Sequence, residues 1–138
     1  MIESSAADAF PVSTADPAIR VVLLPKDTNA HGTIFGGTIL SYIDLAAAVE
    51  VRKHTRQKFV TVAMHEVKFV APVFVGDIVS FYTGLVRIGR TSITTKVVVE
   101  AERVDDPGLR VRVTEAEVVY VAIDEQRNPV PIAGGSGA

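Results

Sequence analysis

One acidic side chain stands in the middle of an apolar segment. Asp44 lies between Tyr42-Ile43 and Leu45-Ala46, and the residues three or four positions away include small ones at 41, 47 and 48. Burying an unpaired carboxylate is costly, so we expect Asp44 to be hydrogen-bonded or open to a cleft. It is either a general base or nucleophile in an apolar slot, or an Asp held by the backbone or a Ser for structural reasons.

A glycine-rich loop directly precedes this acidic segment. Asn29 and His31 lead into the run Gly32-Thr33-Ile34-Phe35-Gly36-Gly37. Glycines let a ligand approach the backbone, and the first free N–H groups of a following helix would suit an oxyanion. An ordinary turn also uses glycine, and His31 could be a capping or surface residue. The glycines alone are therefore weak evidence for a site, and the polar pair before them and the carboxylate after them strengthen that interpretation.

The other polar residues give weaker signals. The hydroxyls of Ser41, Thr61 and Ser92 lie in no nucleophile motif, and the segment 35–39 is not a Gly-x-Ser-x-Gly elbow. The three histidines lack the spacing of metal ligands, so we expect no metal. The run Gly89-Arg90-Thr91-Ser92 fits either a phosphate contact or a plain hairpin turn.

Hydrophobic periodicity predicts one helix and several strands around these residues. Positions 38–54 contain no Pro or Gly and are apolar on almost every face, which predicts a core helix. Strands are predicted at 19–24, 59–69, 77–88, 91–103 and 109–123. In the last of these, a two-residue alternation places the odd-numbered residues on one face. We expect an α+β fold: one central helix is followed by a β-meander, and the meander forms a curved antiparallel sheet that wraps around the helix.

Composition limits the remaining possibilities. The 138 residues fit one domain at 18–127 between flexible tails at 1–17 and 128–138. A net charge of -2 does not favour nucleic-acid binding, and the lack of Cys excludes disulfides and thiol nucleophiles. We find no signal peptide or membrane span and expect a cytoplasmic protein. The 48% hydrophobic content suggests burial against a second copy of the chain.

Specific motifs in this chain are similar to those of a known family. Residues 27–37, followed by Ile39-Leu40-Ser41-Tyr42-Ile43-Asp44, resemble the signature of hotdog-fold acyl-CoA thioesterases, and more narrowly the bacterial YciA-type and cytosolic acyl-CoA hydrolase branch. The likeness covers roughly residues 19–123. Supporting motifs occur at Val60–Ala63, Val67–Phe69, Pro72, Val75–Asp77 and Gly89–Ser92.

The resemblance implies a hotdog fold and hydrolysis of acyl-CoA to a carboxylic acid and CoA, with no cofactor. It implies a homo-oligomer in which dimers joined edge to edge form the active sites and often assemble into hexamers. The family's catalytic acid falls on Asp44, its loop Asn on Asn29, its strand hydroxyl on Thr61 and its oxyanion N–H on Gly37. Residues assigned to substrate or CoA binding are His31, Phe35, Gly36, Thr38, Val62, Ala63, Gly89, Arg90, Thr91 and Ser92.

The chain departs from the YciA-type pattern at two positions. His31 stands where that branch has Asn, and Thr38 stands where it has a bulky aromatic residue. The loop His before a helical acid also fits a second enzyme class, the hotdog dehydratases of 3-hydroxyacyl thioesters. A third alternative is a non-catalytic acyl-CoA sensor. The loop context and the retained acid favour thioester hydrolysis over both.

Overall fold

The computed structural model describes residues 16–133 of the chain. This part folds into one α-helix and five strands, which confirms the predicted α+β class. The elements are β1 (Ile19–Val22), the 3-10 turn η1 (Pro25–Asp27), α1 (Gly36–Arg52), β2 (Phe59–Phe69), β3 (Ile78–Ile88), β4 (Ser92–Glu102) and β5 (Arg110–Ala122). Residues 1–15 and 134–138, which are most of the predicted N-terminal tail and the end of the predicted C-terminal tail, lie outside the described residues.

The helix α1 is buried along one face. It begins two residues earlier than predicted because Gly36 and Gly37 form its first turn, and its core face recurs every three or four positions. The buried apolar residues of that face are Ile39, Ile43, Ala46, Ala47 and Val51. Leu45 and Val49 are 56% and 41% exposed, so the all-round apolar character predicted for the helix leaves an apolar stripe uncovered in a single chain.

The five strands form one antiparallel sheet in the order β1-β3-β4-β5-β2. The prediction of a simple meander is therefore correct for β3, β4 and β5 and wrong for β2, which pairs with β5 at the far edge of the sheet. The connection at 70–77 must therefore pass β5 and β4 to reach β3, and its start is held against β5 because Val70 N–H donates to Val113 C=O at 2.9 Å. As a result β2 is an edge strand, with one side of its backbone unpaired in the monomer.

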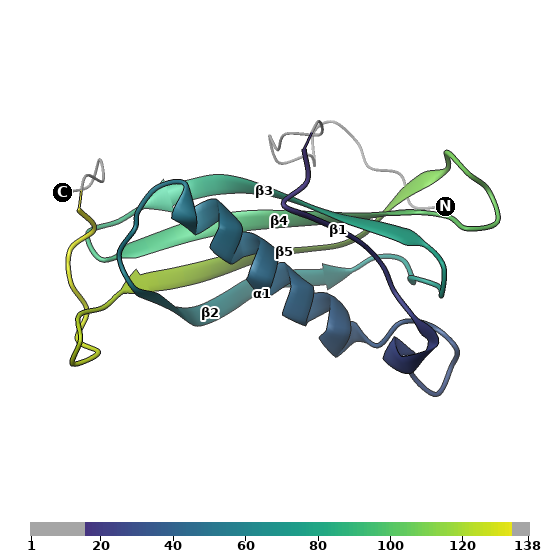
Figure 1. Cartoon of the computed structure of the whole chain (residues 1–138), viewed down its shortest axis with the longest axis horizontal. Helices are drawn as coiled ribbons and strands as arrows, with labels where there is room; N and C mark the ends of the chain where they lie inside the picture. Colours follow the sequence, from purple (N-terminus) through teal and green to yellow (C-terminus); the bar gives the residue numbers. More distant parts are fainter. Residues whose placement is uncertain (1–15, 134–138) are drawn as a thin grey trace.

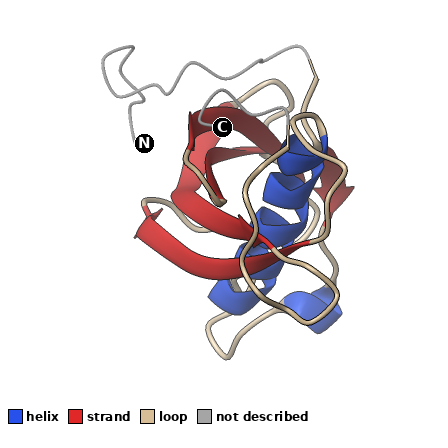
Figure 2. Ribbon diagram, turned by 90° about the vertical axis from the view of Figure 1, so that its left-hand side faces the viewer, coloured by secondary structure: helices blue, strands red, loops and turns tan. Residues whose placement is uncertain are grey.

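The helix lies across one face of the sheet, and the strands curve beside it (Figures 1 and 2). The core fills the space between them, with Ile43 of α1 and Phe81, Val97 and Val118 of the sheet at most 1% exposed. Tyr42 also packs against Phe81, with ring centroids 5.6 Å apart. Among residues 16–133, no helix has the length and apolar content needed to cross a bilayer.

A bulge in β5 changes which residues face the core. Val99 pairs with Thr114, whereas Glu100 pairs with Arg112, so Val113 is an extra residue in the ladder. One extra residue reverses the inward and outward faces of the strand beyond it. The odd-numbered residues of β5 therefore face the core only at Val111 and Val113. Beyond the bulge, the residues that face the core are Ala116, Val118, Tyr120 and Ala122.

The predicted C-terminal tail is partly structured. Val130 N–H donates to Ala122 C=O at 2.9 Å, and Ile132 N–H donates to Arg90 C=O at 2.8 Å. Ile132 is only 2% exposed. The boundary placed at residue 127 from composition is therefore too early, because this apolar side chain and its backbone hydrogen bonds continue the packed domain beyond it.

Candidate active site

The Asp44 carboxylate lies between helix α1 and edge strand β2. The Thr61 hydroxyl of β2 donates to Oδ1 of Asp44 at 2.9 Å. Asp44 is half-buried and Thr61 is exposed, so the carboxylate is hydrogen-bonded and still close to the surface. The two residues that the resemblance assigns as acid and strand hydroxyl are thus brought together.

A third residue, Tyr120 of β5, completes this group. Its hydroxyl lies 2.7 Å from Oδ1 of Asp44 and 2.7 Å from the Asp44 backbone carbonyl oxygen. Burial raises the pKa of the Tyr120 hydroxyl above its ordinary value, and the hydrogen bond and charge of Asp44 raise it further. Tyr120 therefore stays protonated and donates a hydrogen bond.

Sequence reasoning missed Tyr120 because the bulge at Val113 hides its orientation. Counted from Val111, the alternation places residue 120 on the outer face, whereas the structure places it inward, opposite Thr61. A signal was present in the strand itself: Tyr is the only residue of 117–122 that combines a large apolar ring with a polar tip. Such a residue in a core strand requires a hydrogen-bond partner.

The loop before α1 is held by Asn29. Its Oδ1 accepts hydrogen bonds from the N–H groups of His31 at 2.8 Å and Thr33 at 3.2 Å, while its Nδ2 donates to the Thr33 hydroxyl at 2.8 Å. Asn29 thus closes its own loop and does not contact Asp44 of the same chain. His31 is exposed at the loop tip.

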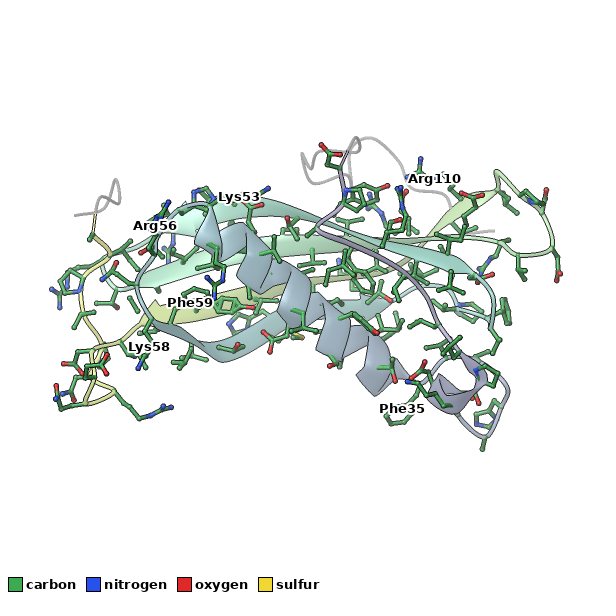
Figure 3. The ribbon with its side chains drawn as sticks, in the orientation of Figure 1. Phe35, Lys53, Arg56, Lys58, Phe59 and Arg110 are labelled. Carbon is green, nitrogen blue, oxygen red and sulfur yellow. The ribbon has the colours of Figure 1, made fainter. Side chains whose placement is uncertain are left out.

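The first turn of α1 presents free backbone donors. Its N-cap residue, Phe35, supplies no side-chain cap, and within the described residues the amides of Gly36 and Gly37 have no hydrogen-bond acceptor. The Phe35 ring covers Gly37 so closely that a Cβ there would lie 2.7 Å from Cε2 of Phe35. Phe35 is itself 57% exposed, at the N-terminal end of the helix (Figure 3).

Gly37 and Asp44 are far apart within one chain. Seven helical positions separate them, or about 10 Å along the axis at 1.5 Å per residue. A thioester carbonyl is much smaller than this distance. A single chain therefore contains two separate parts of a site, the carboxylate group around Asp44 and the donor group around Gly37.

The predicted CoA-binding residues lie on the Asp44 side. Gly89–Ser92 forms the β3–β4 hairpin turn, in which Gly89 N–H donates to Ser92 C=O at 2.8 Å. Ile93, Tyr120 and Thr61 are partners across β4, β5 and β2, so the hairpin begins about two strand spacings, roughly 10 Å, from Thr61. Val62 is a bulged residue of β2 and is 53% exposed, with Ala63 half-buried beside it.

An apolar pocket of about 340 Å³ opens beside the N-terminus of α1. Its lining residues are Ile34, Gly36, Ile39, Phe69, Val70, Ala71, Pro72, Val73 and Thr114. This volume is in the range of small-molecule pockets. The part of the chain that the structure describes contains no group of three His, Asp or Glu side chains placed to hold a metal ion.

Comparison with known sequences gives consistent matches. Residues 31–107, just over half of the chain, match the sequence model of the thioesterase superfamily. The acyl-CoA thioester hydrolase YciA of Escherichia coli is 37% identical over 120 residues, which cover 86% of this chain and 91% of that protein. An uncharacterized acyl-CoA thioester hydrolase of Zymomonas mobilis is 41% identical over 118 residues, which cover 85% of this chain and 78% of that protein.

Solved structures agree with the sequence matches. A hexameric hotdog fold thioesterase of Campylobacter jejuni superposes with a TM-score of 0.79 at 43% identity, covering 85% of this chain and 90% of that chain. A hexameric broad specificity acyl-coenzyme A thioesterase superposes with a TM-score of 0.79 at 35% identity, covering 88% of this chain and 83% of that chain. The hotdog fold implied by the sequence motifs is confirmed.

Proposed function

The chain belongs to the thioesterase superfamily and is an acyl-CoA thioester hydrolase, and we propose that its reacting group is the Asp44 carboxylate. The observation that carries this proposal is the position of Asp44, half-buried beside an edge strand with Oδ1 held by the Thr61 hydroxyl at 2.9 Å. The named relatives are thioester hydrolases, so hydrolysis is favoured over dehydration of 3-hydroxyacyl thioesters and over non-catalytic binding.

Two routes to hydrolysis are open to this carboxylate. As a general base, Asp44 takes a proton from water while the water oxygen attacks the thioester carbonyl carbon, and the C–S bond then breaks to release CoA thiolate. As a nucleophile, Asp44 attacks that carbon itself, the C–S bond breaks to release CoA thiolate, and water then hydrolyses the resulting anhydride to the carboxylic acid and free Asp44. Thiolate is a good leaving group, and neither route needs a cofactor beyond the CoA that the substrate carries.

The oxyanion formed in either route needs a donor, and the Gly37 N–H is the candidate. Because Gly37 and Asp44 of one chain are about 10 Å apart along the helix, the donor for one Asp44 comes from a second copy of the chain. The unpaired edge of β2 and the exposed Leu45 and Val49 on α1 support pairing of two copies at this side. Two similar structures are described as hexameric, which supports a hexamer of three such dimers.

We assign the substrate's parts to neighbouring surfaces. The apolar pocket beside Gly36 suits part of the acyl group, Val62 and Ala63 suit the pantetheine arm, and Arg90 in its hairpin suits a CoA phosphate. In the loop, Asn29 keeps the donor turn in place through its own hydrogen bonds, with His31 and Phe35 at the rim. A cysteine-free composition suits the reducing cytoplasm, which is the compartment we propose.

Asp44→Asn tests the assignment, with Asp105→Asn in the exposed β4–β5 turn as the matched control. Thiol release from short, long and aryl acyl-CoAs is measured for each oligomeric protein, with circular dichroism as the check of folding. We expect Asp44→Asn to lose about 10²- to 10⁴-fold in turnover and the control to lose nothing. Unchanged turnover in Asp44→Asn would contradict the proposal, and hydration of crotonyl-CoA without thiol release would show the dehydratase activity instead.

A further inference from the structure

Tyr120 contacts Asp44 at two atoms with a single hydroxyl group. The Tyr120 oxygen lies 2.7 Å from Oδ1 of the carboxylate and 2.7 Å from the backbone carbonyl oxygen of the same residue. Because the hydroxyl contacts both the backbone and the side chain of Asp44, rotation of the carboxylate about the Cα–Cβ bond would break its contact with Oδ1. The hydroxyl therefore fixes the carboxylate relative to the axis of α1.

The Tyr120 ring is itself firmly held. It is 2% exposed, and it packs edge-on against Phe59 with ring centroids 5.3 Å apart and an interplanar angle of 85°. Phe59 is the first residue of β2 and lies beside α1, as Figure 3 shows. Tyr120 belongs to β5, which is paired on both sides, whereas Thr61 belongs to the edge strand. Tyr120 is thus the more rigid of the two groups that hold Asp44.

Both hydroxyls contact the same carboxylate oxygen. Thr61 lies 2.9 Å and Tyr120 2.7 Å from Oδ1, and within residues 16–133 no protein group is hydrogen-bonded to Oδ2. The two carboxylate oxygens therefore differ in their hydrogen bonding, and so in what they can do chemically. Oδ1 is held by the fold, and Oδ2 is the oxygen that can meet a water molecule or a carbonyl carbon.

We propose that Tyr120 is a positioning residue for the Asp44 carboxylate, which it orients through Oδ1 so that Oδ2 faces the thioester. This inference rests on the proposed function of Asp44 and adds a residue that acts through it.

The hydrogen bonds to the carboxylate come from two neighbouring strands. Tyr120 donates from β5 and Thr61 from the edge strand β2. On α1 itself, the small residues at 41, 47 and 48 leave room around Asp44. Removal of the Tyr120 oxygen therefore leaves the carboxylate held, among the described residues, by the edge-strand hydroxyl.

Tyr120→Phe tests the inference because it removes the oxygen and keeps the ring against Phe59. We expect kcat to fall about tenfold or more with a small change in KM, because the carboxylate loses its orientation while the substrate-binding surfaces are unchanged. A merely structural role would lower the melting temperature or the yield of folded enzyme and leave the kcat of the folded enzyme unchanged.

Tyr82→Phe is the matched control. Tyr82 is equally buried, at 1% exposure, and its hydroxyl contacts Arg110 at 2.6 Å and Arg20 at 3.4 Å, away from Asp44. Its kcat and KM should match those of the unmodified enzyme. A folded Tyr120→Phe enzyme with unchanged kcat would overturn the inference. If Asp44→Asn is inactive at the same time, only the role of Tyr120 fails, whereas an active Asp44→Asn enzyme contradicts the proposed function itself.

Discussion

The Thr61 hydroxyl, on the edge strand of the sheet, is 2.9 Å from Oδ1 of Asp44, on the central helix. The sequence separates these residues by 17 positions and a turn, and the pairing of β2 with β5 brings them together. A change in the position of the edge strand therefore reaches the carboxylate directly. The edge that we propose to pair with a second copy and the carboxylate that we propose to react are therefore linked by one hydrogen bond.

Thr61→Val should lower turnover while preserving the fold. The methyl group replaces a hydroxyl that donates to a charged oxygen, and such a bond is worth roughly 1.5–3 kcal/mol, so we expect a loss of about 10- to 100-fold in kcat. Thr61→Ser keeps the donor and should stay close to the unmodified enzyme. In the double variant with Tyr120→Phe, the two losses should not add, because both donors hold one oxygen. Simple additivity in steady-state kinetics would show that the two hydroxyls act independently.

Gly37→Ala should affect activity more than stability. The new Cβ would lie 2.7 Å from Cε2 of Phe35, and the exposed Phe35 ring can move away at little cost to the fold. Alanine is also the better helix former, by up to about 1 kcal/mol. We therefore expect an unchanged or slightly raised melting temperature together with reduced kcat, since the displaced ring and the methyl group crowd the N–H. Adding Phe35→Ala should relieve the crowding, and a parallel loss of stability and turnover would contradict this account.

Acyl chain preference should respond at two positions beside the first turn of α1. Ala71→Leu narrows the 340 Å³ pocket, so we expect the optimum for thiol release to move toward shorter acyl groups. Thr38→Trp restores the bulky aromatic residue typical of the YciA-type pattern, and we expect a shift in the same direction. A panel of acyl-CoAs of increasing length measures both. A residue whose variant leaves the ranking of substrates unchanged does not line the acyl site.

Glu50 should make the stability of the enzyme depend on pH. Burial alone would raise the pKa of this carboxyl, but hydrogen bonds from His54 at 2.8 Å and Thr83 at 2.9 Å, with the charge of Lys53, hold it below its ordinary value of 4.5. A lowered pKa means that the stabilisation is present above the unfolded-state value and is lost as the pH falls through the folded-state value. The free energy of unfolding should therefore exceed that of Glu50→Gln at pH 7, by a margin that shrinks below about pH 4.5.

Urea unfolding at a fixed protein concentration measures this margin, because the stability of an oligomer depends on concentration. Glu125→Gln is the control, since Glu125 forms an exposed ion pair with Lys58 at 3.5 Å that contributes little. A margin for Glu50→Gln that stays constant from pH 7 to pH 4 would mean that the carboxylate does not contribute through its charge.

Local patterns predicted the elements of this fold well. The 3.6-residue period of the helix and the two-residue alternation of the strands depend only on residues that are close together in the sequence. The observed bounds of α1 and β2 accordingly differ from the predicted ones by at most two residues. The position of β2 was not predictable in this way, because pairing with β5 depends on contacts across about 50 residues of sequence. The bulge at Val113 was also invisible, since one extra residue leaves composition and polarity unchanged.

The same limits apply to the site. The sequence singled out Asp44 because a carboxylate in an apolar segment demands an explanation, and the resemblance supplied Thr61 as its partner. Tyr120 was missed because its direction depends on the bulge. The role expected of Asn29 stays a prediction, since its side chain closes its own loop in the single chain.

Helix α1 starts at Phe35 without a capping side chain. A Ser, Thr or Asp at that position would stabilise the helix by about 1 kcal/mol, and it would do so by accepting hydrogen bonds from the leading amides of the first turn. Those amides are the donors assigned to the thioester oxygen. Under the proposed assignment, an improved cap would compete with the thioester oxygen for the same N–H groups, so stability gained at this peptide group would be accompanied by a loss of turnover.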